Sequence, residues 1–116
     1  MNEQRHNLDV RAEREQDVTI VHLKGEIDLR TSPQLRGMFL KLLDERPPRI
    51  ILELSEVGYV DSSGVGTVVE LKRRAMHHES KVVLVGLQPR VRSLFEITRL
   101  DKFFTVADSI SEARQA

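Results

Sequence analysis

Short apolar runs alternate along this chain with segments in which apolar residues recur at helical spacing, and this alternation constrains the fold most. The apolar runs suit buried strands and lie at residues 18–23, 50–54 and 81–87. Between the first two runs, apolar residues recur at the spacing of a helix with one buried face, at Leu35, Met38, Phe39, Leu42 and Leu43. Strands that alternate with helices predict a mostly parallel α/β sheet.

Weaker strand signals lie near both ends of the chain, at residues 8–12 and 104–106, and a hairpin turn is expected at 16–17. Helix starts are marked by Ser, Thr, Asp or Pro ahead of an apolar stripe, near Thr31, Ser62, Pro89 and Ser109. The inward face of the second helix is expected to consist of Val65, Val68, Val69, Ala75 and Met76.

We therefore predict that residues 1–116 form a single domain, a mixed and mostly parallel sheet of about five strands with about four helices packed against it. Residues 1–6 are polar and are expected to be flexible.

The amino-acid composition argues against several classes of partner and binding site. Lysine plus arginine and aspartate plus glutamate both number 18, and this balance argues against a nucleic-acid partner. The absence of cysteine excludes disulfides and thiolate zinc sites. No apolar run approaches the roughly 18 residues of a membrane span, and we do not expect the polar start to be a signal peptide. We expect a cytoplasmic protein without a cofactor, a metal site or a membrane partner.

The candidate site is the segment Asp61-Ser62-Ser63-Gly64-Val65-Gly66, between an apolar strand and a helix. Loops at the carboxyl ends of strands carry ligand sites in α/β sheets. Helix capping alone would explain Asp61 and the serines, since these are preferred N-cap residues. Capping does not explain Gly64 and Gly66, because glycine in a helix costs about 1 kcal/mol relative to alanine. We expect these small residues to leave the backbone and a hydroxyl open to a partner.

Enzyme motifs do not fit this segment. The Gly-x-Ser-x-Gly elbow of hydrolases is absent, because Val60 or Asp61 stands where its first glycine would be. The Gly-x-x-x-x-Gly-Lys-Ser/Thr phosphate loop does not occur either. Glu26, Asp28 and Asp61 could converge as carboxylates, but we expect them on the surface. We predict no catalytic residues and no metal site, so a hydrolase or nucleotide binder is the weakest candidate.

Taken together, five segments resemble an anti-sigma factor antagonist built on the STAS domain. The two most specific are Gly-Glu-Ile-Asp and Asp-Ser-Ser-Gly, in that order and strand context. The five segments lie at residues 25–28, 31–33, 60–66, 81–86 and 91–95. The resemblance covers roughly residues 8–114 and implies a regulatory binding protein, not an enzyme.

The resemblance implies a switch with two protein partners. The unphosphorylated chain would bind an anti-sigma factor, which is an ATP-dependent serine kinase of histidine-kinase-like fold, and would thereby release a sigma factor. That kinase would phosphorylate the serine directly after the aspartate, which is Ser62 here, with Ser63 as the second choice. A PP2C-type phosphatase would reverse the modification. The partner-binding residues implied are Asp28, Asp61, Ser62, Ser63, Gly64, Val65 and Gly66.

A second class of function stays open at this stage. Some relatives lack the switch and serve as adaptors or scaffolds in signalling or lipid-transport complexes, where Ser62 would merely cap a helix.

Overall fold

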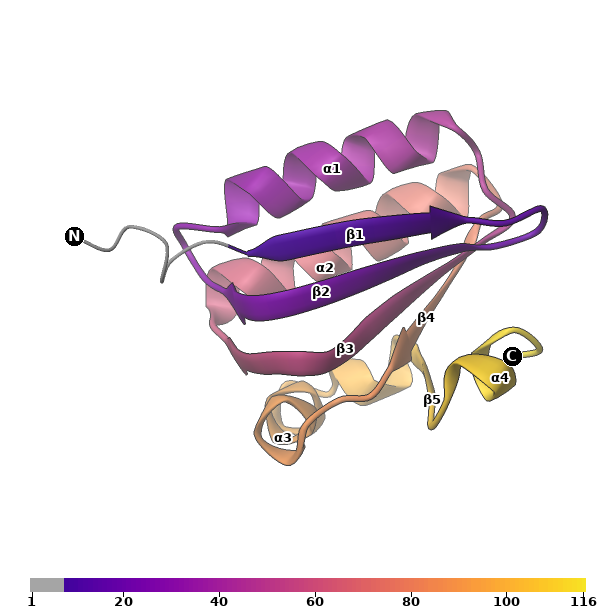
Figure 1. The fold of residues 1–116 in the computed structure, drawn as a ribbon. Helices are drawn as coiled ribbons and strands as arrows, with labels where there is room; N and C mark the ends of the chain where they lie inside the picture. Colours follow the sequence, from indigo (N-terminus) through magenta and orange to yellow (C-terminus); the bar gives the residue numbers. More distant parts are fainter. Residues whose placement is uncertain (1–7) are drawn as a thin grey trace.

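A computed structural model describes residues 8–116, which contain a five-stranded sheet in the order β1-β2-β3-β4-β5 (Figure 1). The edge strand β1 (Asp9–Arg14) runs antiparallel to β2 (Thr19–Ile27). The strands β3 (Arg49–Val60), β4 (Lys81–Val85) and β5 (Thr105–Ala107) then continue in parallel. The predicted mixed, mostly parallel sheet is confirmed. The expected flexibility of residues 1–6 lies outside the described residues.

Helices follow the strands in the predicted alternation. Helix α1 (Ser32–Asp44) and helix α2 (Ser62–His77) lie side by side along one face of the sheet (Figure 1). Helix α3 (Pro89–Ile97) follows β4, and the short helix α4 (Ile110–Ala113) follows β5. No helix of residues 8–116 is both long enough and apolar enough to cross a membrane.

Alternate residues of the strands serve two separate cores, because successive strand side chains point to opposite faces. Ile50 and Leu52 of β3 belong to the larger core, which also contains buried residues of α1, α2 and α3. Ile51, between them, belongs to the smaller core on the opposite face, against which Ile110 of α4 packs. The central strands are covered on both faces, so their apolar runs are continuous.

Helix α1 begins where the sequence predicts, but Thr31 does not cap it with its side chain. The Thr31 hydroxyl instead donates to the carbonyl of Glu26 at 2.7 Å and accepts from the Asp28 amide at 3.0 Å. Thr31 is 2% exposed, so these two hydrogen bonds lie inside the protein and hold the loop between β2 and α1 in place.

One inward residue of α2 was predicted wrongly. Met76 is 57% exposed, whereas Leu71, which the pattern did not single out, is 1% exposed. Val68, Leu71 and Ala75 form the buried stripe. Met76 lies outside this stripe, so its side chain is exposed to solvent.

Candidate functional site

The ends of β2 and β3 meet at one edge of the sheet. Ile27 pairs with Val60 as the last residue of each strand, and the Asp61 amide donates to the Ile27 carbonyl at 3.1 Å. Both strands extend beyond the predicted apolar runs, and their pairing shifts register at two points, between residues 22 and 24 and between residues 25 and 26 of β2. Because the strands are parallel, this register brings the loops that follow them side by side. We call Asp28, Asp61 and residues 62–66 the carboxyl-edge site.

Asp61 caps α2 and joins the two loops. Its Oδ1 accepts hydrogen bonds from the Gly64 amide at 3.0 Å and from the Ser63 hydroxyl at 2.7 Å. Its Oδ2 accepts from the Leu29 amide at 3.1 Å. The Ser63 hydroxyl is the largest cause of a lowered pKa at Asp61; burial, the next largest, opposes it, and the backbone amides add to the lowering. Asp61 therefore carries its negative charge at neutral pH.

The two serines of the carboxyl-edge site lie in different environments. Ser63 is half-buried, and its hydroxyl, besides donating to Asp61, lies 3.2 Å from the hydroxyl oxygen of Ser32. Ser62, the first residue of α2, is exposed, and its side chain makes no hydrogen bond to any residue within 8–116. Ser62 is thus the serine whose hydroxyl faces solvent.

The two glycines differ as well, and one expectation about them was wrong. Gly64 is buried, and a Cβ on it would lie 2.5 Å from the Ile27 carbonyl oxygen and 2.9 Å from Cγ1 of Val60. Gly64 therefore lets α2 pack on the strand ends and does not open the backbone to a partner. Gly66 is exposed, and a Cβ on it would meet nothing within 4 Å. Since Gly66 is four residues after Ser62, both share one face of the helix.

The three acidic residues near the site differ in burial and in hydrogen bonding. Asp28 is half-buried, and its Oδ1 accepts from the amides of Arg30 at 2.9 Å and Thr31 at 3.1 Å. Glu26 is exposed on β2. Asp28 and Asp61 lie in adjacent loops, and each accepts hydrogen bonds from backbone amides.

Three residues of this arrangement could not be found from the sequence motif. Leu29 donates its amide to Asp61, Ser32 contacts Ser63, and the Thr67 hydroxyl donates to the Ser63 carbonyl at 3.0 Å. Leu29 is also 74% exposed. It lines a shallow groove of about 310 Å³ together with Ser32 and Thr67, next to the carboxyl-edge site.

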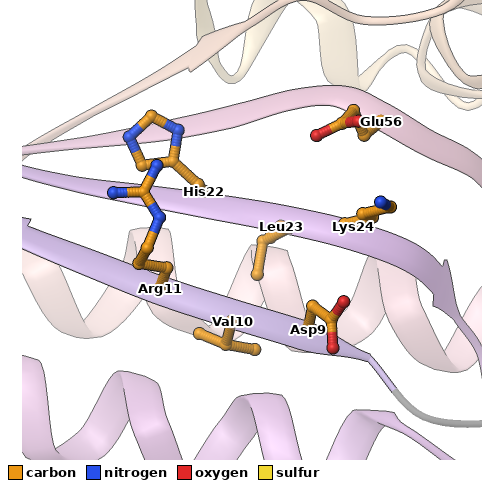
Figure 2. Close-up of a pocket in the computed structure, with 7 residues that line it drawn as sticks. All are labelled: Asp9, Val10, Arg11, His22, Leu23, Lys24 and Glu56. Atoms are coloured by element: carbon orange, nitrogen blue, oxygen red, sulfur yellow. The ribbon is translucent and has the colours of Figure 1, made fainter.

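A larger pocket, of about 480 Å³, contains no residue of the carboxyl-edge site. Figure 2 shows Arg11, His22 and Glu56 projecting from the strands on one side, while Val10 and Leu23 point toward the helices. His22 is bound to Glu13 at 2.6 Å. Over residues 8–116, no group of three or more histidine or acidic side chains is placed to hold a metal ion.

Comparison with known proteins identifies the family of this chain. Residues 9–113 match the family model described as the STAS domain. The anti-sigma-B factor antagonist of Listeria monocytogenes is 32% identical over 94 residues, which cover 81% of this chain and 82% of that protein.

Solved structures agree on the fold. An anti-sigma factor antagonist from Mycobacterium paratuberculosis has a TM-score of 0.85 at 24% identity, covering 93% of this chain and 92% of that one. The phosphorylated form of Bacillus SpoIIAA has a TM-score of 0.72 at 21% identity, covering 92% and 98%. The relatives are named as antagonists of anti-sigma factors, not as enzymes, in agreement with the resemblance found in the sequence. The chain belongs to the STAS domain family.

Proposed function

We propose that the chain is an anti-sigma factor antagonist that works by partner switching. Its unphosphorylated form binds an anti-sigma factor that is also a serine kinase, and this binding releases a sigma factor. The kinase then phosphorylates Ser62, which ends the binding, and a PP2C-type phosphatase restores the free hydroxyl. Because the kinase uses ATP and the output is transcription, the exchange takes place in the cytoplasm.

The contrast between the two serine hydroxyls carries this proposal. A kinase needs a hydroxyl that can reach the γ-phosphate of ATP without first breaking bonds within its own protein. The Ser63 hydroxyl is held by Asp61 and lies against Ser32, whereas the Ser62 hydroxyl is exposed. Gly66, on the same face of α2, adds no side chain beside Ser62. Ser62 is therefore the acceptor that the geometry supports.

The fold itself tolerates a phosphate at this position. A phosphoserine carries a charge of about −1.5 to −2 at neutral pH and adds strong acceptor oxygens. Ser62 is the first residue of α2, where unpaired backbone amides and the helix dipole favour an anion. The modification should therefore leave the folded structure in place and act on whatever binds over it.

A partner that covers the carboxyl-edge site would lose affinity on phosphorylation. Asp61 is already ionised beside Ser62, so a second, larger negative charge in a closed interface brings repulsion and desolvation costs. A loss of about 3 to 4 kcal/mol weakens binding roughly a hundred- to a thousand-fold. That change is large enough for a switch without a change of fold.

The relatives support the same function. The Listeria protein is named for antagonism of an anti-sigma-B factor, and SpoIIAA, of the same fold, has been solved in an unphosphorylated and a phosphorylated form. For this chain, the exposed Leu29 next to Asp61 adds an apolar contact that a protein partner would cover.

The experiment is incubation with the cognate anti-sigma kinase and ATP, followed by intact mass measurement. The wild-type chain and Ser63→Ala should each gain one phosphate, and Ser62→Ala should gain none. A PP2C-type phosphatase with a divalent metal should then return the phosphorylated chain to its original mass. Phosphate on Ser62→Ala, or its absence from the wild-type chain, would contradict the proposal.

A further inference from the structure

A second groove lies between the end of β3 and helix α3. It has a volume of about 230 Å³, and its lining includes Tyr59, Val60, Arg90, Leu94 and Ile97. We propose that this groove is a second part of the partner-binding surface, where it receives an apolar side chain of the anti-sigma partner that is accompanied by a carboxylate. The inference rests on the function proposed above and names the chemistry of that partner.

The groove presents apolar side chains that the fold leaves uncovered. Ile97 is 78% exposed and Tyr59 is 44% exposed, and both stand at the groove. Leu94 is half-buried beside them and packs against the larger core. Single exposed apolar residues are ordinary on a protein surface, but a hollowed cluster of them is typical of an interaction site. An apolar side chain from a partner would bury these groups and displace water from them.

The groove adjoins the carboxyl-edge site at Val60. Val60 lines the groove, and its Cγ1 would lie 2.9 Å from a Cβ on Gly64, in the first turn of α2. Asp61 and Ser62 follow Val60 directly in the chain. A partner that covers the Ser62 hydroxyl therefore meets the groove at the border of the same contact area. This adjacency favours the anti-sigma partner over an unrelated ligand.

The charge at the groove is opposite to that of the carboxyl-edge site. Arg90 is exposed, and it forms no ion pair with any residue between 8 and 116. Asp61, by contrast, is a carboxylate at neutral pH. A complementary partner thus needs a carboxylate opposite Arg90 and a cation opposite Asp61, which fixes the orientation in which it docks.

The test compares Ile97→Asp and Arg90→Glu with the control Met76→Asp. Met76 is 57% exposed but lies near the other end of α2, so its substitution makes the same kind of change outside the groove. Dissociation constants for the cognate anti-sigma kinase should rise about tenfold or more for the two groove variants. Met76→Asp should stay within about twofold of the wild-type value, well under one tenfold step.

Phosphorylation kinetics separate docking from chemistry. With the groove variants as substrates, the KM of the kinase for this chain should rise while its kcat stays unchanged, because neither side chain is needed at the Ser62 hydroxyl. If both groove variants bind the kinase with wild-type affinity while Ser62→Asp clearly loses affinity, the groove is not part of the partner-binding surface. The proposed function would then stand. A lowered kcat without a change in KM would also overturn this role of the groove. Failure of the wild-type chain to bind the kinase would instead overturn the proposed function.

Discussion

The hydroxyl of Ser63 donates a 2.7 Å hydrogen bond to Oδ1 of Asp61. The same oxygen accepts from the Gly64 amide, so Ser63 is part of the cap of α2 and not a free group beside it. The two serines of the motif are therefore bound differently: Ser63 holds the carboxylate, and the Ser62 hydroxyl has no hydrogen-bond partner within residues 8–116. This division can be tested residue by residue.

Ser63→Ala should raise the pKa of Asp61 toward its ordinary value, because the bond from Ser63 is the largest cause of the lowered pKa. A carboxyl whose folded pKa is lowered stabilises the protein above its unfolded pKa and loses that contribution as pH falls through the folded pKa. Ser63→Ala should therefore be less stable at neutral pH and lose less stability on acidification. Carboxyl NMR titration measures the pKa, and urea unfolding across pH measures the stability.

The matched control is Ser62→Ala, which should leave the titration of Asp61 where it is in the wild type. Equal pKa shifts in the two alanine variants would contradict the separate roles of the two serines.

Gly64→Ala should destabilise the fold, because the new methyl group would press against the Ile27 carbonyl oxygen at 2.5 Å. Overpacking of this kind costs typically about 1–3 kcal/mol. Gly66→Ala makes the same chemical change with nothing within 4 Å and should be neutral or stabilising by up to about 1 kcal/mol. The free energies of unfolding in urea give both values, and the reverse order would refute the close packing at Gly64.

Thr31→Val should cost about 1–3 kcal/mol, since it leaves the Glu26 carbonyl and the Asp28 amide without their hydroxyl partner inside the protein. Thr98→Val is the control. The hydroxyl of Thr98 also donates to a backbone carbonyl, that of Leu94, but on the exposed end of α3, where water can replace the bond. Thermal unfolding should show a clear loss for Thr31→Val and little change for Thr98→Val. Equal losses of stability in the two variants would mean that the buried hydrogen bonds of Thr31 do not stabilise the loop.

Helices and strands with a regular pattern of apolar residues could be predicted from the sequence. The stripe from Leu35 to Leu43 predicts α1, and continuous apolar runs predict the buried parts of β3 and β4, because burial on one or both faces dictates those patterns. The short capped helix after Ser109 was also predicted, and the Ser109 side chain accepts from the Glu112 amide.

The geometry of the site could not be predicted in the same way. The register that pairs Ile27 with Val60 depends on two irregularities in the pairing of β2 with β3, at each of which β3 carries one extra residue, and the apolar pattern of the sequence does not show where they fall. The burial of Gly64 follows from that register, because the glycine lies against both strand ends. A motif of small residues after a strand looks the same whether a glycine faces a partner or the protein's own backbone. Only the tertiary arrangement separates the two cases.

The central claim is that a phosphate on Ser62 ends partner binding while the fold persists. The most direct measurement is the dissociation constant of the cognate anti-sigma kinase for the Ser62-phosphorylated and the unphosphorylated chain, with circular dichroism of both. We predict matching spectra and affinity lower by roughly a hundred- to a thousand-fold for the phosphorylated chain. Equal affinity of the two forms would contradict the account.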